Sequence, residues 1–348
     1  MTRQNLSIHG GSVLVIGDTH FTNAFVGSHK DYPAESIELM KSIYRKAEGV
    51  KNLKSVIFLG DLIGVKEQNL RSRLFLSEVM SFFKRLATLC NRNGGVVDDS
   101  GQRVCPVLSV KGNHDMGGRE GYTDFEFLID QGLLVNPGTV DIYSESSGDK
   151  EARLHFVNWG DENERPAVDK LVPNVILAHG EFIVPGQTDI VPGGPNNIDL
   201  TRHKPFRGIG TVISGHIHTS SEQEIEFVNT EGSTSVLFYP GSPARVSERV
   251  EDVYYMVLSS SGEGVELESL LFNLPPVDEV FNPIEPEEID EFADKDYELR
   301  TEKLEEILGE VMSKRLSQGD LISQINRVPY VSEESKSLAK KYLQIAAN

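Results

Sequence analysis

This sequence is organised around Gly112-Asn113-His114-Asp115. It follows an apolar run, residues 104–110, which predicts a buried strand. A glycine at the end of such a strand lets the backbone turn sharply and brings the next side chains to the edge of the sheet. Those side chains are an amide, an imidazole and a carboxylate. They suit a metal ligand, a proton donor and a group that orients the donor.

Four other predicted strands end in similar chemistry. They cover residues 12–17, 55–59, 174–178 and 210–214, and the polar residues at their ends are Asp18, His20, Asp61, His179, His216 and His218. The ligand crevice of a sheet with parallel strands lies beyond the carboxyl ends of those strands, so residues roughly 200 positions apart can converge there. A single histidine after a strand is more often a hydrogen-bonded polar residue than a ligand. Five such strand ends in one chain predict a common site.

Two amphipathic segments separate the first three predicted strands. Residues 34–48 and 69–90 carry apolar side chains at helical spacing, whereas residues 91–102 are polar and glycine-rich and predict a surface loop. Strand, helix, strand, helix, strand is the pattern of right-handed parallel crossover units. The predicted fold class is therefore α/β.

The pattern of the sequence changes at about residue 140 and again near residue 275. Shorter runs at residues 223–228, 233–239 and 252–258 predict an antiparallel second sheet from about residue 220, still within a domain of residues 1–272. Trp159 is expected to be a packing residue. An acidic linker is predicted over residues 273–300. Residues 301–348 predict helices that either pack on their own domain or dock on a partner.

Composition limits the class of protein. The chain has 348 residues and two cysteines, too few for a disulfide framework or a cysteine-based zinc site. Neither a secretion signal nor a membrane-spanning run is visible, so we expect a cytoplasmic protein that does not enter a membrane. The net charge of −19 argues against strong unaided binding to nucleic acid. It fits a plain acidic enzyme, or one whose bound metals and basic partner compensate locally.

The polar residues at the strand ends favour a particular kind of metal. Aspartate, asparagine and histidine without thiolates favour Mn²⁺, Fe²⁺ or Zn²⁺. The candidate ligands exceed what one ion needs, so two divalent ions are implied, and Asp61 with its two oxygens is the natural bridge. The seven candidates are Asp18, His20, Asp61, Asn113, His179, His216 and His218.

The series Asp-x-His, Gly-Asp, Gly-Asn-His-Asp, His-Gly and Gly-His-x-His, over residues 13–218, resembles the calcineurin-like metallophosphoesterase superfamily. The resemblance implies a two-sheet sandwich of βαβ units, with mixed sheets flanked by helices, a C-terminal capping region and a helical tail. It implies that His114 protonates the leaving group and that Asp115 orients His114. It also divides the ligands between two ions: Asp18, His20, Asp61 and His218 for one, and Asp61, Asn113, His179 and His216 for the other.

A second resemblance concerns Phe238-Tyr239-Pro240-Gly241-Ser242-Pro243. This segment, about twenty residues after Gly-His-Ile-His, resembles SbcD-type nucleases, including the phage recombination nucleases. The resemblance implies a Mn²⁺-dependent DNA exo/endonuclease that forms a homodimer and works with an SMC-like ABC ATPase of the SbcC type. Recombination or repair in a bacterial or phage-infected cell would be its role, with the C-terminal helices docked on the ATPase.

Two alternatives to the nuclease remain open. The first is a phosphodiesterase or phosphatase that acts on a small molecule, a nucleotide or a phosphoprotein, and the acidic surface mildly favours it. The second is a non-catalytic scaffold that keeps the metal fold to bind a partner. The intact ligand set and an intact His114 argue against the scaffold.

Overall fold

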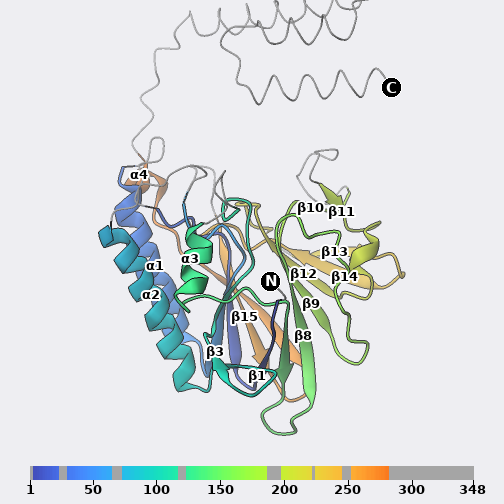
Figure 1. The fold of residues 1–348 in the computed structure, drawn as a ribbon. Helices are drawn as coiled ribbons and strands as arrows, with labels where there is room; N and C mark the ends of the chain where they lie inside the picture. The colour runs from blue at the N-terminus through green and yellow to red at the C-terminus, as the bar shows by residue number, and fades with distance from the viewer. Residues whose placement is uncertain are drawn as a thin grey trace, which may run out of the picture. The chain divides into compact units, whose positions relative to one another are not determined.

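The computed structural model describes residues 3–22, 30–64, 73–116, 123–185, 197–221, 224–244 and 252–281 (Figure 1). The chain divides into two compact units, Met1–Pro283 and Ile284–Asn348. The C-terminal helices predicted for residues 301–348, and most of the predicted acidic linker, lie outside the described residues. The described start of that linker, residues 273–281, contains the short helix α4 (Val277–Val280) and ends in the buried residue Phe281.

The first sheet has five strands in the order β16-β15-β2-β3-β6. Its centre is parallel, because β2 pairs with β3 and β3 with β6 in the same direction, and this confirms the predicted crossover units. Two antiparallel strands complete the sheet on the other side of β2. The bounds are β2 (Ser12–Ile16), β3 (Leu53–Phe58), β6 (Val107–Ser109), β15 (Tyr254–Ser260) and β16 (Val265–Leu271).

Helices α1 (Tyr32–Gly49) and α2 (Arg73–Arg92) cover one face of this sheet (Figure 1). The side chain of Asp31 accepts a hydrogen bond from the Ala34 amide and so caps the start of α1. Leu39, Ile43 and Ala47 recur at helical spacing and are buried against the sheet. The two crossover helices therefore fix the strands whose ends carry Asp18, Asp61 and Asn113.

The second sheet has nine strands in the order β13-β14-β12-β9-β8-β7-β1-β4-β5. The neighbours β8, β9, β12 and β14 run parallel, while the edges contain antiparallel pairs. The bounds are β1 (Asn5–His9), β4 (Val96–Asp98), β5 (Arg103–Val104), β7 (Thr139–Tyr143), β8 (Lys150–Val157), β9 (Asn174–His179), β12 (Thr211–Gly215), β13 (Ile225–Val228) and β14 (Thr234–Phe238).

The two sheets share one apolar core. Val13, Val15 and Ile57 from the five-stranded sheet belong to the same buried cluster as Ile8 and Leu154 from the nine-stranded sheet. A separate buried cluster includes Phe182 of β10 (Phe182–Ile183), which pairs with β11 (Ile198–Asp199). The predicted α/β sandwich of two mixed sheets flanked by helices is thereby confirmed.

The prediction of a separate antiparallel sheet from about residue 220 is wrong. Strands β13 and β14 extend the nine-stranded sheet, and β14 runs parallel to β12. Strand β15 lies in the other sheet, between β2 and β16. Alternating apolar residues identify a strand but not its neighbour, because pairing depends on contacts far apart in the sequence.

Two local predictions also need correction. The predicted loop over residues 91–102 contains β4, which pairs with β1. The predicted strand over residues 104–110 is divided into β5 and β6 around Pro106, which has no amide hydrogen to donate to a sheet. Within the part of the chain that the structure describes, no helix combines the length and the hydropathy needed to cross a bilayer.

Candidate metal centre

All of the predicted site residues lie at or just beyond the carboxyl ends of five strands. Strands β2, β3 and β6 of the five-stranded sheet lead to Asp18 and His20, to Asp61, and to the Asn113-His114-Asp115 stretch. Strands β9 and β12 of the nine-stranded sheet lead to His179 and to the His216-Ile217-His218 stretch. The site is therefore assembled from both sheets, at the edge where these strands end.

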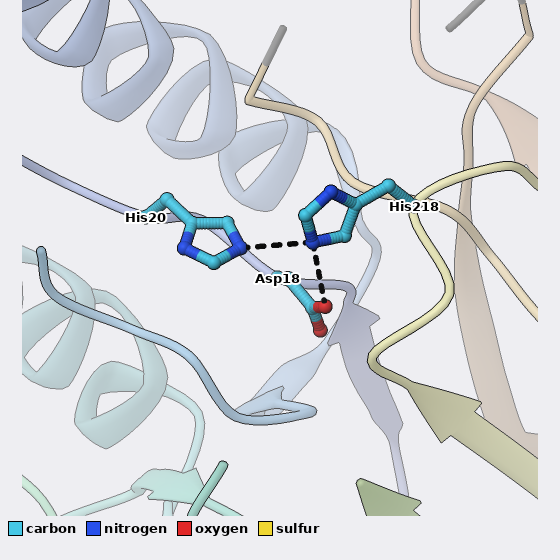
Figure 2. Close-up of side chains that lie close together, drawn as sticks. All are labelled: Asp18, His20 and His218. Atoms are coloured by element: carbon cyan, nitrogen blue, oxygen red, sulfur yellow. Dashed lines mark hydrogen bonds and ion pairs between the residues drawn. The ribbon is translucent and has the colours of Figure 1, made fainter. Parts of the chain in front are cut away.

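Asp18, His20 and His218 form the first group (Figure 2). The Nε2 atoms of His20 and His218 are 3.0 Å apart, and His218 Nε2 is 3.6 Å from Asp18 Oδ2. Burial lowers the pKa of His20 to about 3 and that of His218 to about 4. Both rings are consequently neutral near pH 7, and each keeps a lone pair that a cation can accept.

Asp61, His179 and His216 form the second group, and Asn113 lies among them. His179 Nε2 is 2.9 Å from Asn113 Oδ1 and 3.3 Å from Asp61 Oδ2. His216 Nδ1 is 3.0 Å from the same amide oxygen. His179 Nδ1 donates to the Leu59 carbonyl at 2.8 Å, so its Nε2 is the atom that faces the group.

The electrostatics of the second group call for a positive charge. Burial by itself lowers the pKa of His179, but the carboxylates of Asp18 and Asp61 outweigh burial and raise it to about 9. For Asp61, burial raises the pKa, yet the hydrogen bond and charge of His179 bring it below its usual value. In the absence of a metal, a proton on His179 thus partly neutralises the buried carboxylates.

The residues present fit two divalent cations. In each group of three, the potential ligand atoms lie within 4.8 Å of one another. Asp18 Oδ1 is buried and accepts no hydrogen bond within the described residues. Burial raises the pKa of Asp18 to about 8, an effect that the nearby Asp61 increases and that His179 opposes. A cation between these groups would satisfy the buried oxygens and the facing ring nitrogens together.

The backbone around the site is held in uncommon conformations. His20, Asp61 and His216 have φ angles of 41°, 45° and 80°, which ordinary side chains rarely adopt. Such strain is typical of functional sites, where the surrounding structure fixes it. These loops therefore hold the three side chains in place at a cost in conformational energy.

Glycines in the motifs leave room for neighbouring ligands. A Cβ atom on Gly60 would lie 2.5 Å from His179 Nδ1, and one on Gly112 would lie 2.2 Å from Asp61 Oδ1. A Cβ atom on Gly215 would lie 2.3 Å from Asp18 Oδ1. The glycine of each motif is thus required by the side chain of another motif.

His114 lies beside Asp61. Its Nε2 is 3.9 Å from Asp61 Oδ2, its backbone amide donates to Asp61 Oδ1 at 2.8 Å, and its side chain is 24% exposed. Asp115 is buried and accepts hydrogen bonds from the Leu62 and Gly112 amides. These bonds join the Gly-Asp loop to the Gly-Asn-His-Asp loop. That Asp115 also orients His114 stays a prediction.

Sequence reasoning missed Glu181 and gave Trp159 only a packing role. Glu181 Oε1 accepts a hydrogen bond from His216 Nε2 at 3.1 Å, which leaves Nδ1 of that ring for a cation. The Trp159 ring lies against His216, with centroids 4.6 Å apart, and 6.0 Å from the His179 ring. The only signal for Glu181 was its position two residues after His179.

The Pro240-Gly241-Ser242 segment ties two of the loops together. Ser242 Oγ donates to the Asp18 carbonyl at 2.8 Å, and the Ser242 amide donates to the His218 carbonyl at 3.0 Å. Ser242 is completely buried. We call this segment the serine clasp, because it joins the two loops that carry the first ligand group.

The sequence of residues 11–220 matches the calcineurin-like phosphoesterase family. The chain belongs to this family. The match extends from the start of β2 to just beyond β12, so it includes every predicted ligand. No curated protein matches the sequence of this calcineurin-like phosphoesterase.

Solved structures similar to this phosphoesterase come from several kinds of protein. A protein described as a 5′-nucleotidase from Staphylococcus aureus is 16% identical, with a TM-score of 0.36, over 84% of this chain; the chain spans only 58% of that protein's length. A metallophosphoesterase from Sphaerobacter thermophilus is 13% identical, with a TM-score of 0.31, over 75% of this chain and 89% of that one. Vps29 from Entamoeba histolytica, in complex with Zn²⁺, is 15% identical, with a TM-score of 0.28, over 75% and 99%.

Proposed function

We propose that this calcineurin-like phosphoesterase is a Mn²⁺-dependent DNA exo/endonuclease. It would serve as the nuclease subunit of an SbcCD-like recombination or repair complex that contains an SMC-like ATPase. The observation that carries the phosphodiesterase activity is the convergence of five strand ends on two groups of ligands. The choice of DNA rests on the Tyr-Pro-Gly-Ser-Pro sequence, whose serine joins the loops of Asp18 and His218.

The ligands divide between two ions in this proposal. Asp61 contacts both groups, since its Oδ2 is 3.3 Å from His179 Nε2 and 4.0 Å from His20 Nε2. When bound, the two ions would polarise the phosphoryl group and activate the attacking water. One ion would be held by Asp18, His20, Asp61 and His218, and the other by Asp61, Asn113, His179 and His216.

His114 would act as the general acid. Water adds its oxygen to phosphorus as the bond from phosphorus to the leaving oxygen breaks. The His114 ring gives its proton to that leaving oxygen, and the proton that the water loses restores the ring. The His114 side chain is 24% exposed, so a substrate can reach its ring. The hydrogen bond from the His114 amide to Asp61 fixes the position of His114 relative to the ligands.

The proposed partner is an SMC-like ABC ATPase of the SbcC type, and the active form is a homodimer. The apolar stripe in residues 304–316 supports docking of the C-terminal helices on a coiled coil. A basic partner would also offset the net charge of −19, which otherwise opposes the approach of DNA.

The same net charge favours a second candidate function. A chain that repels phosphate backbones at long range suits a phosphodiesterase or phosphatase for a small molecule, a nucleotide or a phosphoprotein. The metal groups and His114 would have the same roles on such a substrate.

Hydrolysis assays distinguish the two functions. The purified chain with Mn²⁺ is incubated with linear single-stranded and double-stranded DNA and with bis(p-nitrophenyl) phosphate, alone and with any coiled-coil ATPase that co-purifies from its host. The nuclease proposal predicts cleavage of DNA, faster when the ATPase is present. Turnover of the aryl ester alone, even with the ATPase, would contradict it and favour the second function.

A further inference from the structure

A pocket with a volume of about 500 Å³ lies beside the second ligand group. Trp159 connects the two, because it lines the pocket and its ring lies against His216, tilted by 41°. The rest of the lining comes from the residues just after Trp159 and from a second stretch that includes Asn197, Asp199 and Arg202. A molecule in this pocket would therefore reach the metal centre across the indole ring.

The pocket presents side-chain N–H donors that have few partners among the described residues. Within the described residues, neither the Trp159 indole nitrogen nor the Asn163 side-chain amide makes a hydrogen bond. The Arg202 side chain is 88% exposed and forms an ion pair with Asp199, with Nε 3.7 Å from Oδ2, which is too long for a hydrogen bond. An aromatic surface, an amide and a guanidinium thus remain available to a ligand.

The other polar groups of the pocket are already engaged. Glu162 Oε1 accepts a hydrogen bond from the Gly160 amide at 2.9 Å. Asp199 Oδ1 accepts from both the amide and the hydroxyl of Thr201. His203 Nε2 donates to the Glu162 carbonyl at 2.8 Å. One oxygen of each carboxylate is thus engaged by the protein, and the side chains of Trp159, Asn163 and Arg202 offer N–H donors beside a flat ring.

A nucleobase matches this chemistry. Every base has a flat face that stacks on an aromatic side chain, and ring nitrogens and carbonyls at its edge accept hydrogen bonds. Pockets of about 300–1,000 Å³ are usual for small ligands, so the volume suffices for one base with its sugar. A phosphate attached to that sugar would extend past Trp159 toward His216.

We propose that the pocket binds the nucleobase next to the phosphate that is cleaved. The base stacks on Trp159, and the Asn163 amide and the Arg202 guanidinium donate to acceptors on the nucleotide. This inference rests on the proposed function, since it assumes that the metal centre hydrolyses a phosphoester. It makes a nucleotide unit, in DNA or alone, the preferred substrate over an ester without a base.

Fluorescence measures binding independently of hydrolysis, because Trp159 is the only tryptophan of the chain. Thymidine 5′-monophosphate is titrated into the full chain in the presence of EDTA, with ribose 5-phosphate as the ligand that has no base. The nucleotide is expected to change the tryptophan emission saturably, and ribose 5-phosphate is not. Equal responses to both ligands, or no saturable response to the nucleotide, would overturn the proposal.

Matched variants test the two donors. Asn163→Ala combined with Arg202→Ala is expected to weaken nucleotide binding by about tenfold or more. Arg207 is an exposed arginine outside the pocket and forms an ion pair with Glu231. Arg207→Ala removes the same charge, and this variant should bind the nucleotide as the wild type does. Wild-type binding by the double variant would overturn the proposal, and so would equal weakening by Arg207→Ala.

Selectivity in hydrolysis separates this inference from the function on which it rests. With Mn²⁺, kcat/KM is measured for thymidine 5′-(p-nitrophenyl phosphate) and for bis(p-nitrophenyl) phosphate. The ratio should favour the nucleoside ester and fall about tenfold in the double variant but not in Arg207→Ala. A ratio that stays the same in the double variant would contradict the pocket. Hydrolysis of neither ester, with nucleotide binding intact, would contradict the phosphodiesterase function instead.

Discussion

At the scale of the residue, the tautomer of His216 depends on Glu181. A carboxylate that accepts from Nε2 holds the proton there and leaves Nδ1 to face Asn113. Partners of this kind typically change metal affinity by about 10–100-fold. Glu181 would therefore support the second proposed ion although it lies outside the predicted ligand set.

Replacement of Glu181 tests this contribution. Glu181→Ala should weaken the second Mn²⁺ by about 10–100-fold and leave the first nearly unchanged, as measured by calorimetric titration. Glu181→Gln should recover most of the affinity, because its amide oxygen can still accept from His216. Glu164→Ala, at an exposed glutamate, is the control. Wild-type affinity for both ions in Glu181→Ala would show that the hydrogen bond is incidental.

His114 provides a second prediction. His114→Gln should keep both Mn²⁺ ions, because the residue is outside the ligand set, but lose about 10²–10⁴-fold in kcat, since only the leaving-group proton is removed. Metal content is measured by elemental analysis and turnover with an aryl phosphodiester. If the variant loses both ions, the role assigned to His114 is wrong.

The candidate ligands could be selected from the sequence because each lies at or just beyond the end of an apolar strand. Glu181, Trp159 and Ser242 could not be assigned in the same way. Their roles depend on contacts with His216, with the pocket and with the Asp18 loop, and none of these contacts is local in the sequence. A Pro-Gly-Ser sequence is also ordinary turn chemistry, so it gave no sign of a bond to the Asp18 carbonyl.

At the scale of the element, the serine clasp connects the loop after β2 with the loop after β12. The clasp packs closely against Gly17, since a Cβ atom on Gly17 would lie 1.9 Å from the Gly241 carbonyl oxygen. Ser242 donates one hydrogen bond to each loop. These contacts fix Asp18 and His218 relative to each other through a segment that belongs to neither β2 nor β12.

Loss of the Ser242 hydroxyl should loosen this connection. Ser242→Ala is expected to lower the free energy of unfolding by about 1–3 kcal/mol, because the buried Asp18 carbonyl loses a donor. It should also weaken the first Mn²⁺. Denaturant unfolding and calorimetry measure the two effects. Ser233→Ala, at an exposed serine, is the control, and a clasp variant indistinguishable from it would contradict this role.

The pairing of β7 with β8 predicts a pH-dependent stability. Burial alone would raise the pKa of Asp141, but hydrogen bonds from Arg153 and Lys150 outweigh it and hold the pKa below its usual value. A lowered pKa contributes stability that is fully present above the unfolded pKa of about 3.9 and is lost as the pH falls through the folded pKa.

Asp141→Asn should therefore reduce the free energy of unfolding by about 1 kcal/mol at pH 7, and this difference should shrink below about pH 4. Urea unfolding from pH 7 to pH 3 measures it, with Asp149→Asn at an exposed aspartate as the control. A difference that does not change with pH would mean that the ion pair is not its source.

Some secondary-structure elements could be predicted from the sequence better than others. The strands and helices of the two crossover units have long, regular apolar patterns, and the structure confirms them. Strands such as β4, with three residues, carry too little pattern to be distinguished from a loop. The sheets to which β14 and β15 belong were mispredicted. The two strands join different sheets, and the contacts that decide this lie in the core that both sheets share.

At the scale of the whole molecule, the candidate metal centre bridges the two sheets. The five-stranded sheet leads to Asp18, His20, Asp61 and Asn113, and the nine-stranded sheet leads to His179, His216 and His218. Each proposed ion takes ligands from both. Ion binding should accordingly stabilise the packing of one sheet on the other, since a ligand that binds only the folded state raises its stability.

Asp61 is the residue common to both proposed ions. Asp61→Asn should weaken both Mn²⁺ sites at once, because it removes the negative charge next to His179 and His20. Asp99→Asn, at an exposed aspartate in the turn after β4, is the control for the loss of one charge. Full occupancy of both sites in Asp61→Asn, measured by elemental analysis after dialysis, would contradict the bridging role.

The most direct test is a crystal structure of the chain grown with Mn²⁺, with anomalous diffraction recorded at the manganese edge. We predict two anomalous peaks, one among Asp18, His20 and His218 and one among Asn113, His179 and His216, with Asp61 in contact with both. A single peak, or a second peak outside these residues, would contradict the two-ion centre from which the proposed chemistry follows.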